Sequence, residues 1–303
     1  MKVVKAFVRF FMRLLALLPL KVHYALGRFV SWLLERVFRY RYSEVTANLA
    51  RCFPQKDYSE LKDIRHRFYV HFGRIVAESV WFGGSSAGRL KKQDLVSFEG
   101  LDELAGLYES SPGVMVLMSH AGNWELYGGF ESYQEEPVFF TADKVCIVYL
   151  QQSSKLWDAV MRDNRLAPMH DPAGFEGYLE ARRVLRYALE HKADKKVYNF
   201  IIDQYPYFGQ KNPLHVWFMN QDTVTMTGAA DLAHKLGLAV CYLSVLEEKK
   251  GHYIYKYVPL CADASALGSD EIMQKYYSML EEDLHAQPWN YLWTHRRWKM
   301  LNT

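Results

Sequence analysis

The feature that most constrains the fold lies between residues 114 and 130, where an apolar run ends abruptly in polar residues. Val114–Met118 is entirely apolar, and Ser119 and His120 follow at once. A short apolar run bounded by turn residues is typical of a buried strand. Asn123 then precedes an apolar and aromatic segment, and its side-chain oxygen suits the N-cap of a helix. The pattern predicts a strand, a tight turn and a helix, with His120 where the strand ends.

His120 and Glu125 are five residues apart. On one continuous helix they would lie roughly 140° apart and could not meet. If the chain turns between them, the Glu125 carboxylate can reach the imidazole, fix its tautomer and leave the other ring nitrogen as a general base. From the spacing alone, a strand-end histidine with only local hydrogen bonds is an equally good interpretation, because a general base is identified by geometry.

Composition limits the function classes. Half of the 303 residues are hydrophobic, which is enough for one α/β domain with a helical extension. The net charge of +3 gives no indication of nucleic-acid binding. The four cysteines form no C-x-x-C pair, which favours reduced thiols in a cytoplasmic environment. We predict no metal site, because His66 and His71 are five apart on a predicted helix and no other ligand cluster is present.

The first 40 residues are apolar and basic. The longest uncharged run, Leu14–Leu20, is shorter than the about 20 residues of a spanning helix. The residues after it form a poor signal-peptide cleavage site. We expect residues 1–40 to be an amphipathic segment that lies on an anionic membrane surface, followed by a domain over residues 41–303. Two helices that pack on the domain, and a tilted span with snorkelling arginines, are the alternatives.

Further candidate residues follow later elements. A predicted strand at residues 197–202 ends at Asp203 and Gln204, where side chains of α/β sheets commonly face a ligand, although Asp203 could instead cap a turn. Arg162 and Arg165 share one helix face, and Arg165 suits a phosphate or favours the helix dipole. Thr227 opens a helix whose amino terminus suits a phosphate, but simple capping explains it equally well.

Several motifs together resemble one family. Residues 120–125, HAGNWE, resemble the H-x-G-N-W-E form of the H-x4-D/E motif of the lysophospholipid acyltransferase superfamily, in the wording typical of the bacterial lipid A biosynthesis (lauroyl/myristoyl) acyltransferases. Similar matches are the N-L-x-x-x-F-P element at 48–54, D-Q-x-P at 203–206, the V-x-F-F-G-type stretch at 216–225 and the aromatic, basic ending at 287–299. Asn220 stands where the family usually has glycine. The resemblance covers about residues 40–299.

The resemblance implies an α/β fold with a mixed central sheet flanked by helices, like the glycerol-3-phosphate and lysophospholipid acyltransferases, and an N-terminal membrane-associated helical segment. It implies transfer of a fatty acyl chain from acyl carrier protein, or from acyl-CoA, to a hydroxyl of a lipid A precursor. The reaction would need no cofactor and would take place on the cytoplasmic side of the inner membrane. The implied catalytic residues are His120 and Glu125, and the implied substrate-binding residues are Asn123, Arg165, Asp203, Gln204 and Thr227.

In the implied mechanism, His120 deprotonates the acceptor hydroxyl while Glu125 holds the imidazole. A thioester is already activated, so no acyl-enzyme is expected. Backbone amides after His120, or Arg165, are candidate donors to the oxyanion. The aromatic and basic ending suits an anionic glycolipid, or it pins the fold through buried tryptophans. Two alternatives stay open: the same chemistry on a lysophospholipid or an amino-acid-headgroup lipid, and a membrane lipid-binding protein without turnover.

Overall fold

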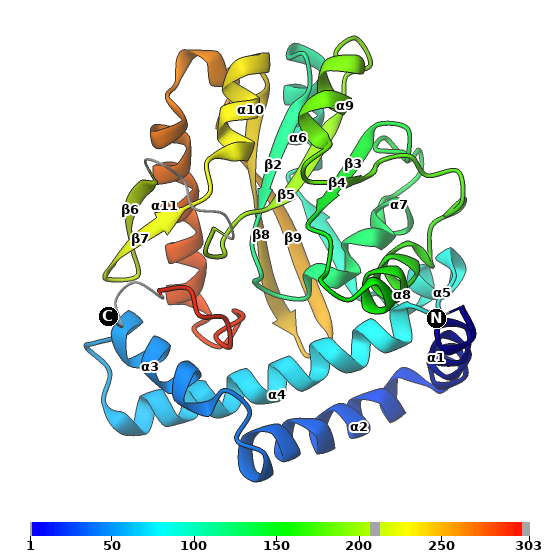
Figure 1. The fold of residues 1–303 in the computed structure, drawn as a ribbon, viewed down its shortest axis with the longest axis vertical. Coiled ribbons are helices and arrows are strands. Elements are labelled where there is room, and N and C mark those ends of the chain that lie inside the picture. The colour runs from blue at the N-terminus through cyan, green and yellow to red at the C-terminus, as the bar shows by residue number, and fades with distance from the viewer. Residues whose placement is uncertain (1, 207–212, 299–303) are drawn as a thin grey trace.

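The computed structural model describes residues 2–206 and 213–298, and its centre is a seven-stranded sheet in the order β1-β9-β8-β2-β5-β3-β4 (Figure 1). Only the β8–β9 pairing is antiparallel, so the sheet is mixed, as expected. A separate hairpin pairs β6 with β7. The strands are β1 (Val96–Glu99), β2 (Val114–Met118), β3 (Val145–Tyr149), β4 (Tyr178–Glu180), β5 (Val197–Ile201), β6 (Leu214–Phe218), β7 (Gln221–Thr225), β8 (Ala239–Lys249) and β9 (His252–Cys261).

Helices surround this sheet. The α-helices are α1 (Lys2–Ala16), α2 (Leu20–Trp32), α3 (Tyr42–Cys52), α4 (Tyr58–Phe82), α5 (Ala87–Gln93), α6 (Leu101–Ser110), α7 (Phe130–Tyr133), α8 (Lys155–Leu166), α9 (Val184–Glu190), α10 (Gly228–Leu236) and α11 (Ser269–Ala286). The other helical segments are a π-helix η1 (Leu33–Val37) and the 3-10 helices η2 (Trp124–Gly129) and η3 (Ala264–Ala266).

Strand β2 is central because both of its faces are buried. Side chains alternate along a strand, so Met115 and Leu117 join one core, with residues of α10 and α11. Val114, Val116 and Met118 join a second core, with residues of α6 and α7. The continuous apolar run therefore matches a strand covered on both faces, and His120 follows where β2 leaves the sheet.

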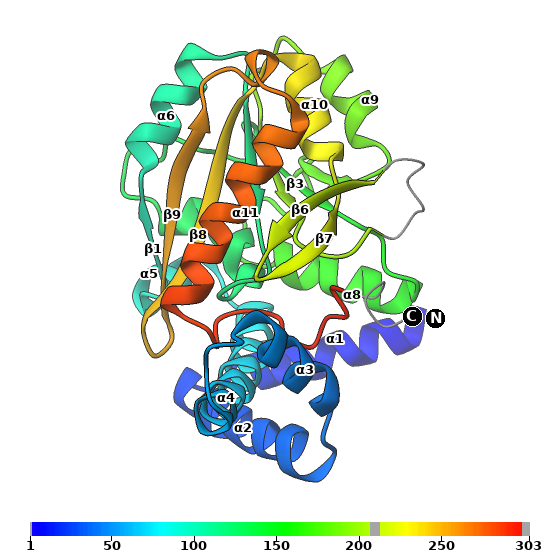
Figure 2. The ribbon, with the colours of Figure 1, turned by 90° about the vertical axis from the view of Figure 1, so that its left-hand side faces the viewer.

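Helices α1 to α4 form a layer at one end of the sheet, at the bottom of both views (Figures 1 and 2). Helix α2 packs closely on α4 where Gly27 meets Gly73. A side chain would prevent this approach, because a Cβ on Gly73 would lie 2.4 Å from the Gly27 carbonyl oxygen. The first residues thus pack on the domain, while many of their apolar side chains stay exposed. Among the described residues, no helix is both long enough and apolar enough to span a bilayer.

The structure adds strands to those predicted. Strand β4 lies within residues 171–181, which the sequence predicts to be irregular, because its three residues are too few for a periodic pattern. The β6–β7 hairpin turns at Met219 and Asn220, which have φ of 51° and 62°. Positive φ at both central residues is typical of a type I′ hairpin turn, which confirms that Asn220 accommodates the turn in place of glycine.

Candidate active site

His120 lies just beyond the carboxyl end of β2, beside the residues that follow the neighbouring strand β5. Its Nδ1–H donates to Asp203 Oδ1 at 2.7 Å. Burial alone would raise the pKa of Asp203, but attraction to His120 and the hydrogen bonds it accepts hold that pKa below its ordinary value. An ionised carboxylate only accepts hydrogen bonds, so it fixes the proton on Nδ1 and leaves the Nε2 lone pair free to accept a proton.

The other nitrogen of the imidazole faces a weak donor. Gln204 Nε2 lies 3.2 Å from His120 Nε2, and the His120 side chain is 18% exposed while that of Asp203 is 1% exposed. The ring also meets Trp124 edge to face at 4.8 Å. The imidazole is therefore partly exposed, whereas its carboxylate partner is enclosed. Sequence analysis placed Asp203 and Gln204 in substrate binding, but the structure gives both direct contact with the histidine.

Glu125 does not occupy the place that the sequence predicted for it. Its carboxylate accepts from Arg165 Nε and Nη2, both at 2.6 Å, and from Trp124 Nε1 at 3.0 Å. Burial would raise the pKa of Glu125, but attraction to Arg165, the hydrogen bonds from Arg165 and Trp124 and attraction to His120 together lower it. The expected hydrogen bond between Glu125 and His120 is thus replaced by the Asp203 bond. The segment after Asn123 is a 3-10 helix, and Glu125 on it meets Arg165 of α8.

Each nitrogen of the Arg165 guanidinium contacts a protein group. Its third donor, Nη1, lies 3.2 Å from the hydroxyl of Tyr178 on β4. Gly128 allows this approach, because a Cβ there would lie 1.9 Å from the Arg165 carbonyl oxygen. The bidentate pair joins α8 to residues 120–125 and occupies Nε and one N–H of Nη2, so a contact of Arg165 with a phosphate would use its remaining N–H groups.

Asn123 is also buried rather than open to substrate. It makes no side-chain capping bond, and its Nδ2 donates to Glu78 Oε2 of α4 at 2.8 Å. The same carboxylate accepts from the hydroxyls of Tyr253 at 2.9 Å and Tyr24 at 3.0 Å. Burial raises the pKa of Glu78 to about 7, although these three bonds and nearby Arg74 oppose the shift. Sequence analysis assigned Glu78 no role; its apolar neighbours on α4 were the only signal.

The carboxy-terminal segment holds the turn that follows His120. Gly122 N donates to Asn290 Oδ1 at 2.9 Å, and Leu292 N donates to the His120 carbonyl at 3.1 Å. Gly122 has φ of 61°, and a Cβ there would lie 2.1 Å from Val245 Cγ1. Only glycine fits this position without strain. Because Ala121 N contacts Ser119 Oγ at 3.3 Å, both amides after His120 already have partners inside the protein.

The rest of this terminal segment is structural. Trp293, Arg297 and Trp298 are 1%, 2% and 4% exposed. Arg297 donates to the Val224 carbonyl and the Tyr277 hydroxyl, and Trp298 donates to Thr223. These contacts match the pinning interpretation and leave these three side chains unavailable to a headgroup. Lys299 lies outside the described residues.

Thr227 is not part of this group. Its hydroxyl donates to Asp231 Oδ2 at 2.7 Å and makes no capping bond, and no contact in the described part of the chain joins it to His120. The described residues contain no group of three or more His, Cys, Asp or Glu side chains that could hold a metal ion.

Comparisons with known proteins identify the family of this chain. The family model for bacterial lipid A biosynthesis acyltransferases matches residues 2–300. A lipid A biosynthesis palmitoleoyltransferase of Escherichia coli and a lipid A biosynthesis acyltransferase of Shigella flexneri are each 25% identical over 292 residues, which cover 93% of this chain and 86% of theirs. The solved 1-acyl-sn-glycerophosphate acyltransferase PlsC of Thermotoga maritima aligns over 88% of this chain and 97% of its own, at 16% identity and a TM-score of 0.34, a likeness too weak to argue from. On the family match, the chain belongs to the bacterial lipid A biosynthesis acyltransferases.

Proposed function

We propose that this protein transfers a fatty acyl chain from an acyl-carrier-protein thioester to a hydroxyl of a lipid A precursor, at the cytoplasmic face of the inner membrane. Family membership supports acyl transfer. The observation that carries the proposal is the His120–Asp203 pair, in which a buried carboxylate binds Nδ1 of a partly exposed histidine and leaves Nε2 on the other side of the ring. That arrangement suits a base that acts on a hydroxyl.

The reaction balances without an acyl-enzyme. His120 Nε2 takes the proton of the acceptor hydroxyl as its oxygen attacks the thioester carbonyl. The tetrahedral intermediate then collapses, the C–S bond breaks, and the thiolate takes the proton from the imidazolium. Asp203 stabilises the imidazolium through Nδ1, the role that sequence analysis gave to Glu125. We propose instead that Glu125 binds Arg165 and thereby holds α8 against residues 120–125.

Gln204 is our proposed donor to the developing oxyanion. The amides of Ala121 and Gly122 already have partners, and Nε and Nη2 of Arg165 are bound to Glu125. The Gln204 amide contacts Nε2 in the resting site. When an acceptor hydroxyl binds His120 Nε2, it takes the place of the Gln204 amide. The amide is then free to donate to the oxygen of the reacting carbonyl, where a donor is needed.

The test compares wild type with His120→Ala by mass spectrometry of lipids from the source cells, and by transfer from acyl-carrier-protein to a lipid A precursor in vitro. Loss of one acyl chain from lipid A alone supports the proposal. Loss of a phospholipid or an aminolipid instead would keep the chemistry and refute the acceptor. Near-normal transfer by a folded His120→Ala protein would refute the mechanism.

One isosteric variant tests the carboxylate that contacts His120. Asp203→Asn should lower kcat at least about a hundredfold while the melting temperature changes little, because it misdirects the imidazole proton. Unchanged kcat in Asp203→Asn would show that another group orients His120.

A further inference from the structure

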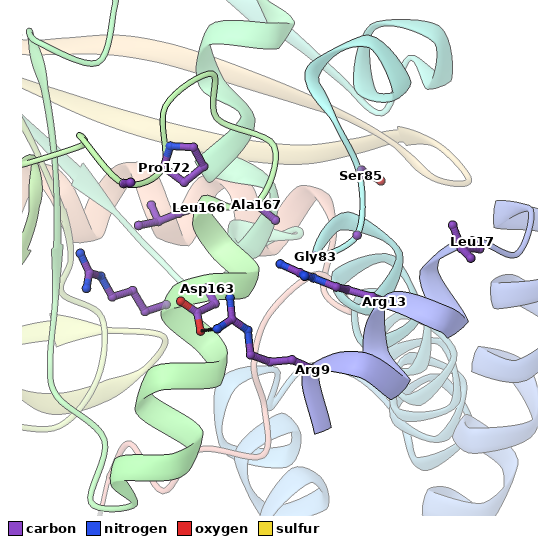
Figure 3. Close-up of a pocket in the computed structure, with 12 residues that line it drawn as sticks. Arg9, Arg13, Leu17, Gly83, Ser85, Asp163, Leu166, Ala167 and Pro172 are labelled. Atoms are coloured by element: carbon purple, nitrogen blue, oxygen red, sulfur yellow. Dashed lines mark ion pairs between the residues drawn. The ribbon is translucent and has the colours of Figure 1, made fainter. Parts of the chain in front are cut away.

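A basic cavity lies outside the site described above, between α1, α8 and the loop after α4. It has a volume of about 650 Å³. Arg9, Arg13 and Arg162 line it together with one carboxylate, Asp163, so the charged lining sums to +2 (three cations and one anion). Arg13 extends from α1 toward α8, beside the ion pair of Arg9 with Asp163 (Figure 3). Its rim includes Leu17, which is 72% exposed.

The walls of the cavity are closely packed. A Cβ on Gly84 would lie 2.3 Å from Ala16 Cβ, and one on Gly83 would lie 1.6 Å from Asn164 Oδ1. Asp163 Oδ2 holds α1 on α8 through Lys5 Nζ at 3.0 Å and Arg9 Nη1 at 3.1 Å. The positions of the cavity-lining cations therefore follow from helix packing.

Two of these cations lack an acidic partner. Within residues 2–206 and 213–298, no carboxylate pairs with Arg13 or Arg162, and the only ring near Arg162 is that of Tyr178 at 5.9 Å. Guanidinium groups bind phosphate oxygens in bidentate fashion. Arg13 and Arg162, with Arg9 nearby, therefore favour a ligand with several anionic oxygens. The chemistry of the cavity thus fits a phosphate.

An apolar surface lies next to the cavity. Helix α1 and the turn after it expose large apolar side chains, of which Leu17 lines the cavity and those on α1 lie on a different helix face from Arg9 and Arg13, namely Phe7, Phe10, Phe11, Leu14, Leu15, Leu17 and Leu18. This arrangement suits a molecule with a phosphate head and acyl chains, because the head can enter the cavity while a chain contacts Leu17 at the rim.

We propose that the cavity between α1 and α8 binds the phosphate headgroup of a membrane lipid, with Arg13 and Arg162 as its main ligands. This inference concerns binding and is independent of acyl transfer, so its test reads binding alone. A lipid headgroup bound here would hold α1 in the headgroup layer at one fixed position, in addition to the diffuse attraction of its other basic residues.

The experiment measures flotation of the full-length protein with vesicles of phosphatidylcholine, with and without phosphatidic acid. Arg13→Gln/Arg162→Gln removes the two proposed ligands. Lys21→Gln/Arg28→Gln is the matched control, because both residues are exposed on α2, outside the cavity, and the charge change is equal. We expect the cavity variant to bind the anionic vesicles about tenfold more weakly than the control does, since charge-assisted contacts are stronger than diffuse attraction. Binding to pure phosphatidylcholine should be equal for both.

Equal losses in the two double variants, or no loss in either, would overturn the proposal. A second arm separates a lipid from free phosphate by titration with dihexanoyl phosphatidic acid and with inorganic phosphate. We expect the short-chain lipid to bind at least about tenfold more tightly, through the apolar rim; equal affinities would refute a lipid site. If the double variant fails to fold, the exposed Arg162→Gln alone is compared with Arg28→Gln in both arms.

Discussion

Glu78 offers a quantitative test of the environment beneath the active-site turn. Its carboxyl group is buried at the junction of Tyr24 of α2, Tyr253 of β9 and Asn123. Burial raises the pKa of Glu78 from 4.5 to about 7 in the folded protein. The difference of about 2.5 units corresponds to about 3 kcal/mol of unfolding free energy.

The sign follows from proton binding. Between pH 4.5 and 7 the folded state holds the Glu78 proton while the unfolded chain loses it, so the unfolding free energy falls as pH rises and levels off above 7. Glu78→Gln keeps a neutral group of the same shape at every pH. At pH 5 we expect the variant to match wild type within about 1 kcal/mol, and at pH 8 to be more stable by about 2–3 kcal/mol.

The assay is urea unfolding in neutral detergent, followed by tryptophan fluorescence at pH 5, 6, 7 and 8. Other groups, including His71 and Arg74 on the same helix, affect wild type and variant alike, so the difference between the two curves isolates Glu78. Glu109→Gln, at an exposed position on α6, should parallel wild type throughout. Parallel curves for wild type and Glu78→Gln would refute the reasoning, since they would mean that Glu78 ionises normally.

Three further predictions concern the active site. Glu125→Gln should lower the unfolding free energy by about 3–5 kcal/mol, because it leaves the Arg165 guanidinium without its charge partner; a melting temperature close to that of wild type would contradict the buried pair. Gly122→Ala should abolish activity and increase protease sensitivity, whereas Gly228→Ala, whose Cβ would meet nothing within 4 Å, should behave as wild type. Gln204→Ala should lower kcat about 10- to 100-fold at nearly constant KM in the transfer assay, and an unchanged kcat would exclude it as the oxyanion donor.

The sequence predicted those parts of the fold and site that depend on local patterns. The apolar runs at β2 and β5 were long enough to be recognised as buried strands, and polar residues just after both strands were expected at the functional site. His120 and Asp203 do lie side by side, because β2 and β5 are parallel neighbours that end at the same edge of the sheet.

Sequence spacing could not predict that Asp203, and not Glu125, is the carboxylate that contacts His120. Asp203 is 83 positions from His120, and their contact depends on the strand order, in which β5 neighbours β2. Glu125 is only five positions away, but the 3-10 helix that carries it brings its side chain to Arg165. Likewise, Glu78 reaches Asn123 only because α4 crosses the end of the sheet where the active-site turn lies (Figure 1).

Helix α8 connects the cavity that we propose for a lipid headgroup with the candidate active site. Within one turn, Asp163 binds Lys5 and Arg9 of α1, Asn164 donates to the Ser79 carbonyl of α4, and Arg165 grips Glu125 beside the active-site histidine. These contacts join α8 to three different parts of the protein. While the Asp163 contacts hold, a shift of α1 would move α8 and with it the Arg165–Glu125 pair. Exposed ion pairs of this kind are weak, each contributing about 0–1 kcal/mol. A lipid headgroup beside Arg13 and Arg162 would add contacts at the same junction of α1 and α8. If the proposed headgroup binds there, we expect the position of α1 and the alignment of the active-site turn to be coupled through this turn of α8.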